Sequence, residues 1–335
     1  MNLGVVEKIA KAVLYEGYML YPYRPSSVKN RQRWNFGVVY PQAYNEAQGG
    51  EEASSMRTEC LVSGSTDTVL AIKLRFLHLR TRSAGQTSVP AWGGSLPDGW
   101  QEAVERDVSL PEFKLETLRG ETLTHAFEFP AQAQSEEERD RSGQSVAVVV
   151  RRQAAVEGAV DVTVQSVGEN LFKISILVRN TTPPETPAAS RDDALMQSLV
   201  STHTILGVER GAFISLLEPP AELQDLVSQC QNVGAWPVLV GNEGQRDTLL
   251  ASPIVLYDYP QIAPESAGDL FDGTEIDEIL SLRIMTLTDE EKREIRQSDE
   301  RARQILERTD SMPAEQFLKL HGAIRGMRPL KENNP

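Results

Sequence analysis

Two kinds of hydrophobic periodicity divide the chain. Near the N-terminus, apolar residues such as Val6, Ile9 and Val13 recur at helical spacing, which predicts a helix over residues 3–20. From about residue 58 onward, apolar residues alternate with polar ones, which is typical of β-strands with one buried face. The pattern therefore predicts an N-terminal helix followed by a β-rich body.

The β-rich part contains many short strand candidates with turn residues between them. A Gly/Pro/Ser-rich connection over 81–115 and a charged loop over 135–142 are expected to interrupt them. Short strands at this spacing indicate an antiparallel sandwich or barrel. The predicted strands cover residues 58–62, 67–80, 115–118, 123–129, 145–152, 159–166, 171–179 and 212–217, with a further pair at 236–241 and 253–259.

The C-terminal part reads as helical again. Thr274-Glu-Ile-Asp277 and Thr288-Asp-Glu-Glu291 each place a hydroxyl three residues before a carboxylate, which is the pattern of a capping box. We therefore expect an α+β protein with a mainly antiparallel, sandwich-like or barrel-like β body. Residues 1–57 would form an N-terminal helix and a Tyr/Pro-rich segment, and residues 58–217 the β body. Residues 218–335 would form an α/β segment that ends in acidic helices and packs on the N-terminal segment.

Charge and composition narrow the class of protein. The 335 residues carry a net charge of −14, which makes nucleic acid an unexpected partner for the chain as a whole. The longest apolar runs are too short to span a bilayer, and the N-terminus lacks the pattern of a secretory signal. Only Cys60 and Cys230 are present, which is consistent with a reducing compartment. We expect a cytoplasmic protein.

The eight tyrosines are confined to two places. Six lie between Tyr15 and Tyr44, and the other two form the Tyr257-Asp258-Tyr259 turn. Tyrosine has an apolar body with a polar tip, so it is common where a surface is half-buried or contacts a partner. We take the following as candidate partner-binding residues: Tyr15, Tyr18, Tyr21, Tyr23, Arg24, Arg33, Trp34, Tyr257, Asp258 and Tyr259.

The two tyrosine-bearing regions differ in charge. Residues 1–41 contain six Lys or Arg against two Glu, whereas residues 258–300 contain thirteen Asp or Glu against four Lys or Arg. Opposite charge favours contact between the two ends, or between the acidic end and a basic partner. We predict that the two regions meet in the fold, with Arg24 or Arg33 near Asp258 or Glu265.

No motif for catalysis is recognisable. The four histidines are scattered, and neither cysteine lies in an activating motif, so we lean away from an enzyme and expect no cofactor. The acidic region 258–278 is an alternative site for a metal or for catalysis, with Asp269, Asp272 and Glu275 as the candidate metal ligands, although helix capping accounts for these acids more simply. Single-stranded nucleic-acid binding through residues 24–34 is a weaker alternative.

Two long blocks resemble a known family. They are Val13-Leu-Tyr-Glu-Gly-Tyr-Met-Leu-Tyr-Pro-Tyr-Arg-Pro-Ser-Ser-Val-Lys-Asn30 and Ser252-Pro-Ile-Val-Leu-Tyr-Asp-Tyr-Pro-Gln-Ile-Ala-Pro-Glu-Ser266, the latter continued by 269–279. The chain resembles, over nearly its whole length, an uncharacterised bacterial family encoded with high-affinity, atmospheric-hydrogen-oxidising nickel–iron hydrogenases. The resemblance implies a non-enzymatic accessory, assembly or scaffold protein whose partners are hydrogenase subunits or maturation proteins. It carries over no catalytic residue, because none is assigned in that family.

Overall fold

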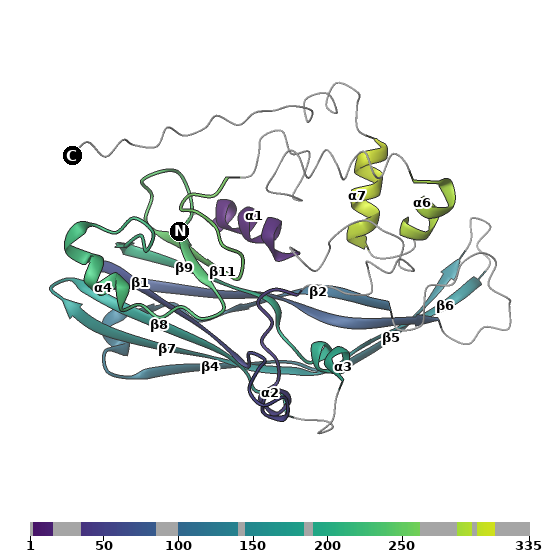
Figure 1. Ribbon diagram of the computed structural model, residues 1–335, viewed down its shortest axis with the longest axis horizontal. Helices are drawn as coiled ribbons and strands as arrows, with labels where there is room; N and C mark the ends of the chain where they lie inside the picture. The colour runs from purple at the N-terminus through teal and green to yellow at the C-terminus, as the bar shows by residue number, and fades with distance from the viewer. Residues whose placement is uncertain are drawn as a thin grey trace.

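A computed structural model describes residues 3–15, 35–84, 100–139, 145–183, 190–261, 287–296 and 300–311. Within these ranges, eleven strands join in one sheet, and every ladder between them is antiparallel. The prediction of a mainly antiparallel β body with helices at both ends is thereby confirmed (Figure 1).

The elements follow one another along the chain with few long helices. The strands are β1 (Ser55–Ala84), β2 (Trp100–Ser109), β3 (Phe113–Lys114), β4 (Thr122–Phe129), β5 (Gln132–Arg139), β6 (Ser145–Gln153), β7 (Val156–Gly168), β8 (Leu171–Asn180), β9 (Val200–Phe213), β10 (Trp236–Leu239) and β11 (Thr248–Ser252). The helices are α1 (Leu3–Leu14), α2 (Gln42–Ala47), α3 (Arg191–Met196), α4 (Gln224–Ser228), α6 (Asp289–Arg296) and α7 (Glu300–Asp310), with short 3₁₀ turns η2 (Leu115–Leu118) and η3 (Ala221–Leu223). None of the helices in the described ranges is long and apolar enough to cross a membrane.

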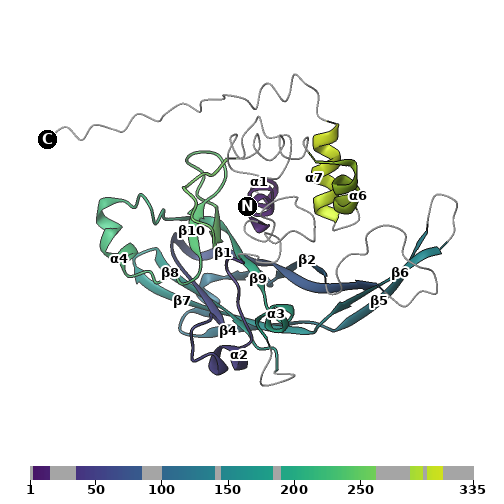
Figure 2. The same cartoon turned by 45° about the vertical axis from the view of Figure 1, so that its right-hand side comes forward.

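The 30-residue strand β1 organises the sheet. Its first part pairs with β8 and its middle part with β9, while its last part pairs with β2 and β6. The strand order is β10-β11-β9-β1-β8-β7-β4, with β2, β3, β5 and β6 off this path. β1 therefore pairs both with strands of the main path and with β2 and β6, which lie off it. β5 and β6 extend from the body as an arm (Figures 1 and 2).

The sheet folds back on itself to enclose one main core. Phe76 on β1 lies 6.1 Å from Phe127 and 5.8 Å from Phe129, measured between ring centroids, although both partners are on β4, three strands away in the sheet order. Side chains of β1, β7, β8 and β9 fill the space between the two halves. The observed architecture is thus a single open sheet with a sandwich-like interior.

Two predicted interruptions of the sheet are wrong. The connection predicted over 81–115 contains β2, and most of the charged loop predicted over 135–142 is β5, paired with β6. The described side chains of β5 are all exposed to solvent, so charged residues can occupy this strand without being buried. The hydrophobic pattern fails there, since the strand is held by the backbone of its neighbour and buries little.

Three further boundaries also differ from the prediction. The predicted strands 58–62 and 67–80 are parts of β1, and the predicted strand 115–118 is the 3₁₀ turn η2. β10 pairs with Thr248–Ser252 and not with 253–259, because the chain leaves the ladder at Pro253. The capping box that opens α6 is confirmed by reciprocal hydrogen bonds of Thr288 and Glu291.

Helix α1 packs on the sheet beside the segment that follows β11. Its apolar face contacts β9, β10 and β11 together with Leu256, so N-terminal and C-terminal segments share a small core. Glu7 of α1 accepts a hydrogen bond from Lys73 of β1 at 2.8 Å, and Lys73 also pairs with Asp107 of β2 at 3.3 Å. The helix is therefore fixed to the sheet by both apolar contacts and charge.

Candidate functional site

The Tyr257-Asp258-Tyr259 turn closes one edge of the sheet. β10 is the last strand in the sheet order, and its Leu239 N–H donates to Asp258 Oδ1 at 2.8 Å. The Tyr259 N–H donates in turn to the Leu239 carbonyl at 2.7 Å. Both main-chain groups of Leu239 are thus satisfied by the turn, which takes the place of a further strand that the described residues do not supply at this edge.

Asp258 also ties this edge to the segment after β9. Its Oδ2 accepts a hydrogen bond from the Ser215 hydroxyl at 2.5 Å. The same Ser215 oxygen accepts from the main-chain N–H groups of Leu217 and Glu218, at 3.2 and 2.9 Å. One carboxylate therefore holds three segments together, and we call this region the Asp258 corner: residues 215–218, 236–239 and 255–259.

The backbone of the corner is strained at one residue. Tyr259 has φ 57°, in the left-handed region that non-glycine residues rarely adopt. Its half-buried ring packs against the main core, while its N–H is bound to Leu239. These two contacts offset a cost of about 1–2 kcal/mol for the left-handed conformation, so the turn has a defined shape.

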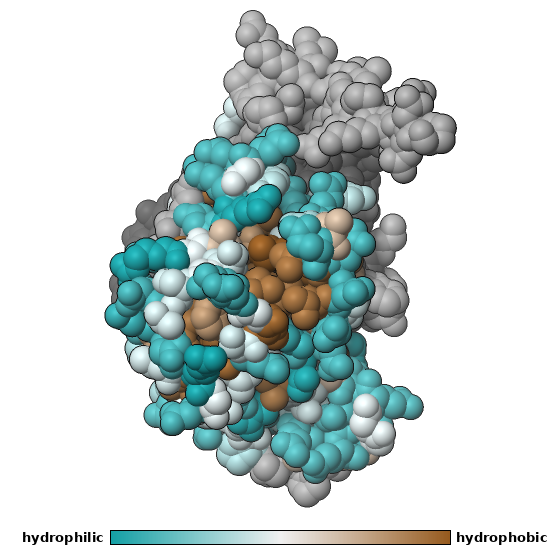
Figure 3. Space-filling view, turned by 90° about the vertical axis from the view of Figure 1, so that its left-hand side faces the viewer, coloured by the Kyte–Doolittle hydropathy of each residue, from teal (hydrophilic) through white to brown (hydrophobic). Residues whose placement is uncertain are grey.

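The corner exposes large apolar side chains. Tyr257 is 86% exposed, Val255 72%, Leu217 52% and Trp236 46%. Asp258 and Ser215 connect the main-chain segments that carry them. Beside these four side chains, the end of the molecule that carries β10 and α4 shows strongly hydrophobic residues bordered by polar ones (Figure 3).

The structure describes four of the ten predicted partner-binding residues. Tyr257, Asp258 and Tyr259 form the corner, and Tyr15 at the end of α1 donates a hydrogen bond to Glu105 at 3.1 Å. The other six, Tyr18, Tyr21, Tyr23, Arg24, Arg33 and Trp34, lie outside the described residues, as do Asp269, Asp272 and Glu275 of the predicted acidic metal site. Within the described ranges no group of His, Cys, Asp and Glu has the arrangement of a metal site.

The described tyrosines of the two regions belong to different apolar clusters. Tyr15, Tyr40 and Tyr44 pack around Leu77 and Leu79 of β1, whereas Tyr259 packs on the main core. Segments next to the two regions do lie close together: Gly37 lies directly against Pro253, and α1 lies against Leu256. A contact between the tyrosines of the two regions stays a prediction. The expected pairing of Arg24 or Arg33 with Asp258 or Glu265 involves both arginines and Glu265, which lie outside the described ranges.

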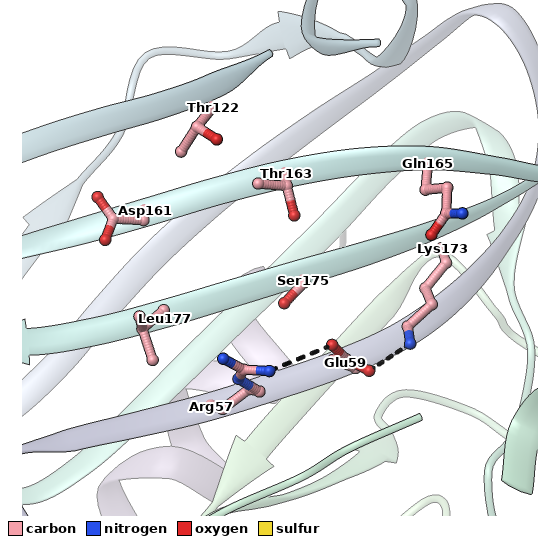
Figure 4. A pocket seen from close by; sticks show the side chains of 9 residues that line it. All are labelled: Arg57, Glu59, Thr122, Asp161, Thr163, Gln165, Lys173, Ser175 and Leu177. Atoms are coloured by element: carbon pink, nitrogen blue, oxygen red, sulfur yellow. Dashed lines mark ion pairs between the residues drawn. The ribbon is translucent and has the colours of Figure 1, made fainter. Parts of the chain in front are cut away.

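A polar groove of about 430 Å³ crosses the outer face of β1, β8, β7 and β4 (Figure 4). Its charges are mostly paired: Lys173 contacts Glu59 at 2.5 Å, and Arg179 contacts the lining carboxylate of Asp161 at 2.7 Å. Burial alone would raise the pKa of Glu59, but the hydrogen bond from the Gln231 N–H and the Lys173 ammonium lower it. The lining residues are Arg57, Glu59, Thr122, Asp161, Thr163, Gln165, Lys173, Ser175 and Leu177. They alternate along the strands as any solvent-facing residues do, so the sequence carried no signal for the groove.

Three arginines converge on the buried carboxylate of Glu102. Arg80 contacts it at 2.7 Å, Arg151 at 3.1 Å and Arg82 at 3.8 Å, and Glu102 is only 6% exposed. These side chains come from β1, β2 and β6, which are distant in the sequence and meet only through the strand register. No pattern in the sequence marks this cluster.

Both deeply buried histidines are held neutral by the fold. Burial lowers the pKa of His203 to about 4, and burial together with the Arg106 charge lowers that of His78 to about 4. His78 Nε2 lies 3.0 Å from the Ala154 carbonyl and His203 Nδ1 lies 2.7 Å from the Ser201 carbonyl. Burial also raises the pKa of Cys60 far above its usual range, so its thiol is inert near neutral pH.

These histidines predict a stability that falls in acid. Because their folded-state pKa of about 4 lies below the 6.5 of the free side chain, the unfolded chain binds protons more readily. Their contribution is complete above pH 6.5 and decreases towards pH 4 by up to about 1.4 kcal/mol per pH unit for each histidine. Urea unfolding at a series of pH values should show that His203→Gln reduces this slope. A slope equal to that of the wild type in this variant would contradict the prediction.

Comparison of the chain with models of known protein families gave no match, and comparison with curated proteins gave none either.

Proposed function

We propose that this protein is a non-enzymatic accessory or scaffold protein that binds a protein partner through the Asp258 corner. The observation that carries the proposal is the exposure of Tyr257, Val255, Leu217 and Trp236 on segments held together by one carboxylate. Five of the six large apolar side chains that are exposed in the described residues come from positions 217–257. Apolar groups gathered in this way favour contact with another protein.

The chemistry of the corner suits such contact. Trp and Tyr bury much area with few rotatable bonds, and both are enriched at the centre of protein interfaces. The hydrogen bonds of Asp258 fix the supporting main chain at Leu239 and, through Ser215, at Leu217. Such preorganisation lowers the entropy lost on binding.

The setting of the proposal is a nickel–iron hydrogenase in the cytoplasm. Residues 255–259 of the corner lie within Ser252–Ser266, the second of the two blocks that resemble the hydrogenase-associated family. Hydrogenase subunits or maturation proteins are therefore the partners that we propose first. Of the alternative metal or catalytic region 258–278, the structure describes Asp258, and both of its carboxylate oxygens are engaged in hydrogen bonds of the fold.

A double substitution in the corner tests the proposal. Trp236→Ser with Tyr257→Ser should leave the free energy of unfolding almost unchanged, since substitutions of exposed side chains usually alter it by less than about 0.5 kcal/mol. The same variant should capture much less hydrogenase subunit or maturation protein after cross-linking in the native host, measured by quantitative mass spectrometry. Thr163→Ala in the polar groove is the control and should capture as much as the wild type.

Two results would contradict the proposal. One is recovery of no hydrogenase subunit or maturation protein by the wild type, even after cross-linking. The other is equal recovery by the double variant and the wild type, which would remove the corner as the binding surface.

A further inference from the structure

The edges of the sheet are protected to different degrees. On β10, Pro237 has no N–H to offer, and Asp258 and Tyr259 satisfy Leu239. On β5, consecutive acids at 136–138 place charge along the strand, which discourages pairing with another chain. β4 pairs with β7 on one side, and in the described part of the chain no strand pairs with its other side.

The register shows which groups of β4 face outward. Glu157 of β7 donates its N–H to Thr182 and accepts at its carbonyl from Thr181, so both of its main-chain groups point away from β4. Glu128, which is directly opposite Glu157, therefore directs its own N–H and carbonyl to the outer edge. Because this ladder has no register shift, the alternation gives Ala126, Thr124 and Thr122 the same outward direction. The edge thus offers four N–H and four C=O groups to an additional strand.

The inward-facing side chains of β4 are incompletely covered. Leu123, Phe127 and Phe129 pack on the main core but remain only partly buried. Phe127 lies over Gly158, where a side chain would collide with its ring, so β7 leaves room for this ring and β4 forms the margin of the core. An added strand with apolar residues at alternate positions would cover this margin.

The solvent-facing side of β4 carries unbalanced negative charge. Glu128 and Glu157 are directly opposite each other, and neither forms an ion pair with a basic residue in the described part of the chain. Like charges at opposed positions destabilise a sheet. β4 itself contains no Lys or Arg, and a basic residue on an added strand would offset the charge of Glu128.

We infer that the outer edge of β4 binds an extended segment of a protein partner as an additional antiparallel or parallel strand. The fitting segment has apolar residues on the face next to Phe127 and Phe129, and a Lys or Arg next to Glu128. A second copy of this chain fits less well, because each copy carries a net charge of −14 and brings no basic residue to the edge. The inference rests on the proposed function only in assuming a protein partner, since the β4 edge and the Asp258 corner belong to opposite ends of the sheet order.

A model peptide tests the edge directly. The probe is a fluorescein-labelled peptide of alternating Lys and Val, matched to the eight residues of β4, with binding followed by anisotropy. Hydrogen exchange on the full chain should show slower exchange at the N–H groups of Thr124, Ala126 and Glu128 when the peptide is bound. A peptide of alternating Glu and Val should bind more weakly, because it places acid beside Glu128.

Three substitutions of Ala126 distinguish the contribution of its main-chain N–H to peptide binding from that of its side chain. Ala126→Pro removes an outward N–H and should lower the affinity by about tenfold while preserving the fold, because proline is tolerated on edge strands. Ala126→Lys is a second blocking variant that keeps the N–H, and Ala126→Val is the matched control that should bind like the wild type.

Several outcomes would overturn the inference. They are the absence of peptide binding, equal binding by Ala126→Pro and Ala126→Val, or binding without protection of the β4 amides. A wild-type dimer in sedimentation that Ala126→Lys dissociates would assign the edge to a second copy instead. The corner variant Trp236→Ser with Tyr257→Ser should still bind the peptide, so failure of the edge and failure of the proposed function are distinguishable.

Discussion

Replacing Phe76 with alanine should lower the free energy of unfolding by about 3–5 kcal/mol, the range for removing a large buried aromatic ring. Phe76 is completely buried and contacts Phe127 and Phe129 across the interior. It joins the part of β1 that pairs with β9 to the opposite layer formed by β4. Removing the ring leaves a cavity at the point where the sheet folds back, which the surrounding strands can fill only in part.

Urea unfolding monitored by circular dichroism measures this effect. Phe36→Ala is the matched control, because the same atoms are removed from a ring that is 44% exposed, and it should cost less than about 1 kcal/mol. Equal losses of stability in the two variants would show that Phe76 does not join the layers.

The strand content could be predicted because period two survives wherever one face of a strand is buried. Ile72, Leu74 and Phe76 alternate with charged neighbours, and all three lie in the main core. Period two does not mark β5, whose described side chains are all exposed. It does not mark β2 either, where the buried Glu102 occupies an inward position that is usually hydrophobic. Periodicity reports burial, so it misses strands that are held mainly by backbone pairing or by ion pairs.

The candidate site could be located from the sequence only as a composition anomaly. Clustered tyrosines pointed to Tyr257 and Tyr259, which the structure places at a corner with exposed apolar groups. The role of Asp258 could not be predicted, since its partners Ser215 and Leu239 are set by tertiary contacts. The open edge of β4 could not be predicted from the sequence either. An edge depends on which strands are neighbours and on which main-chain groups point outward, and both are set by the tertiary fold.

Glu102→Gln should lower the free energy of unfolding by about 3 kcal/mol, the low end of the range for removing one partner of a buried ion pair. Arg82 beside it is 7% exposed, Arg151 20% and Arg80 30%. Glutamine keeps the size of the side chain but removes the negative charge. Three guanidinium groups would then lie close together, incompletely hydrated and without a compensating carboxylate. The substitution should also loosen the contact between β2 and β6, which meet through Arg151.

Glu136→Gln is the control for this prediction, because Glu136 also contacts Arg151, at 2.7 Å, but is 68% exposed. An exposed pair contributes only about 0–1 kcal/mol, so the control should unfold almost like the wild type. Comparing urea unfolding of the two variants separates the effect of burial from that of the contact distance, because both carboxylates bind the same arginine. If the two losses were equal, the arginines around Glu102 would have to be well hydrated in the folded state. The ion pairs around Glu102 would then orient the arm of β5 and β6 without stabilising it. The stability of this end of the sheet would depend on its backbone ladders.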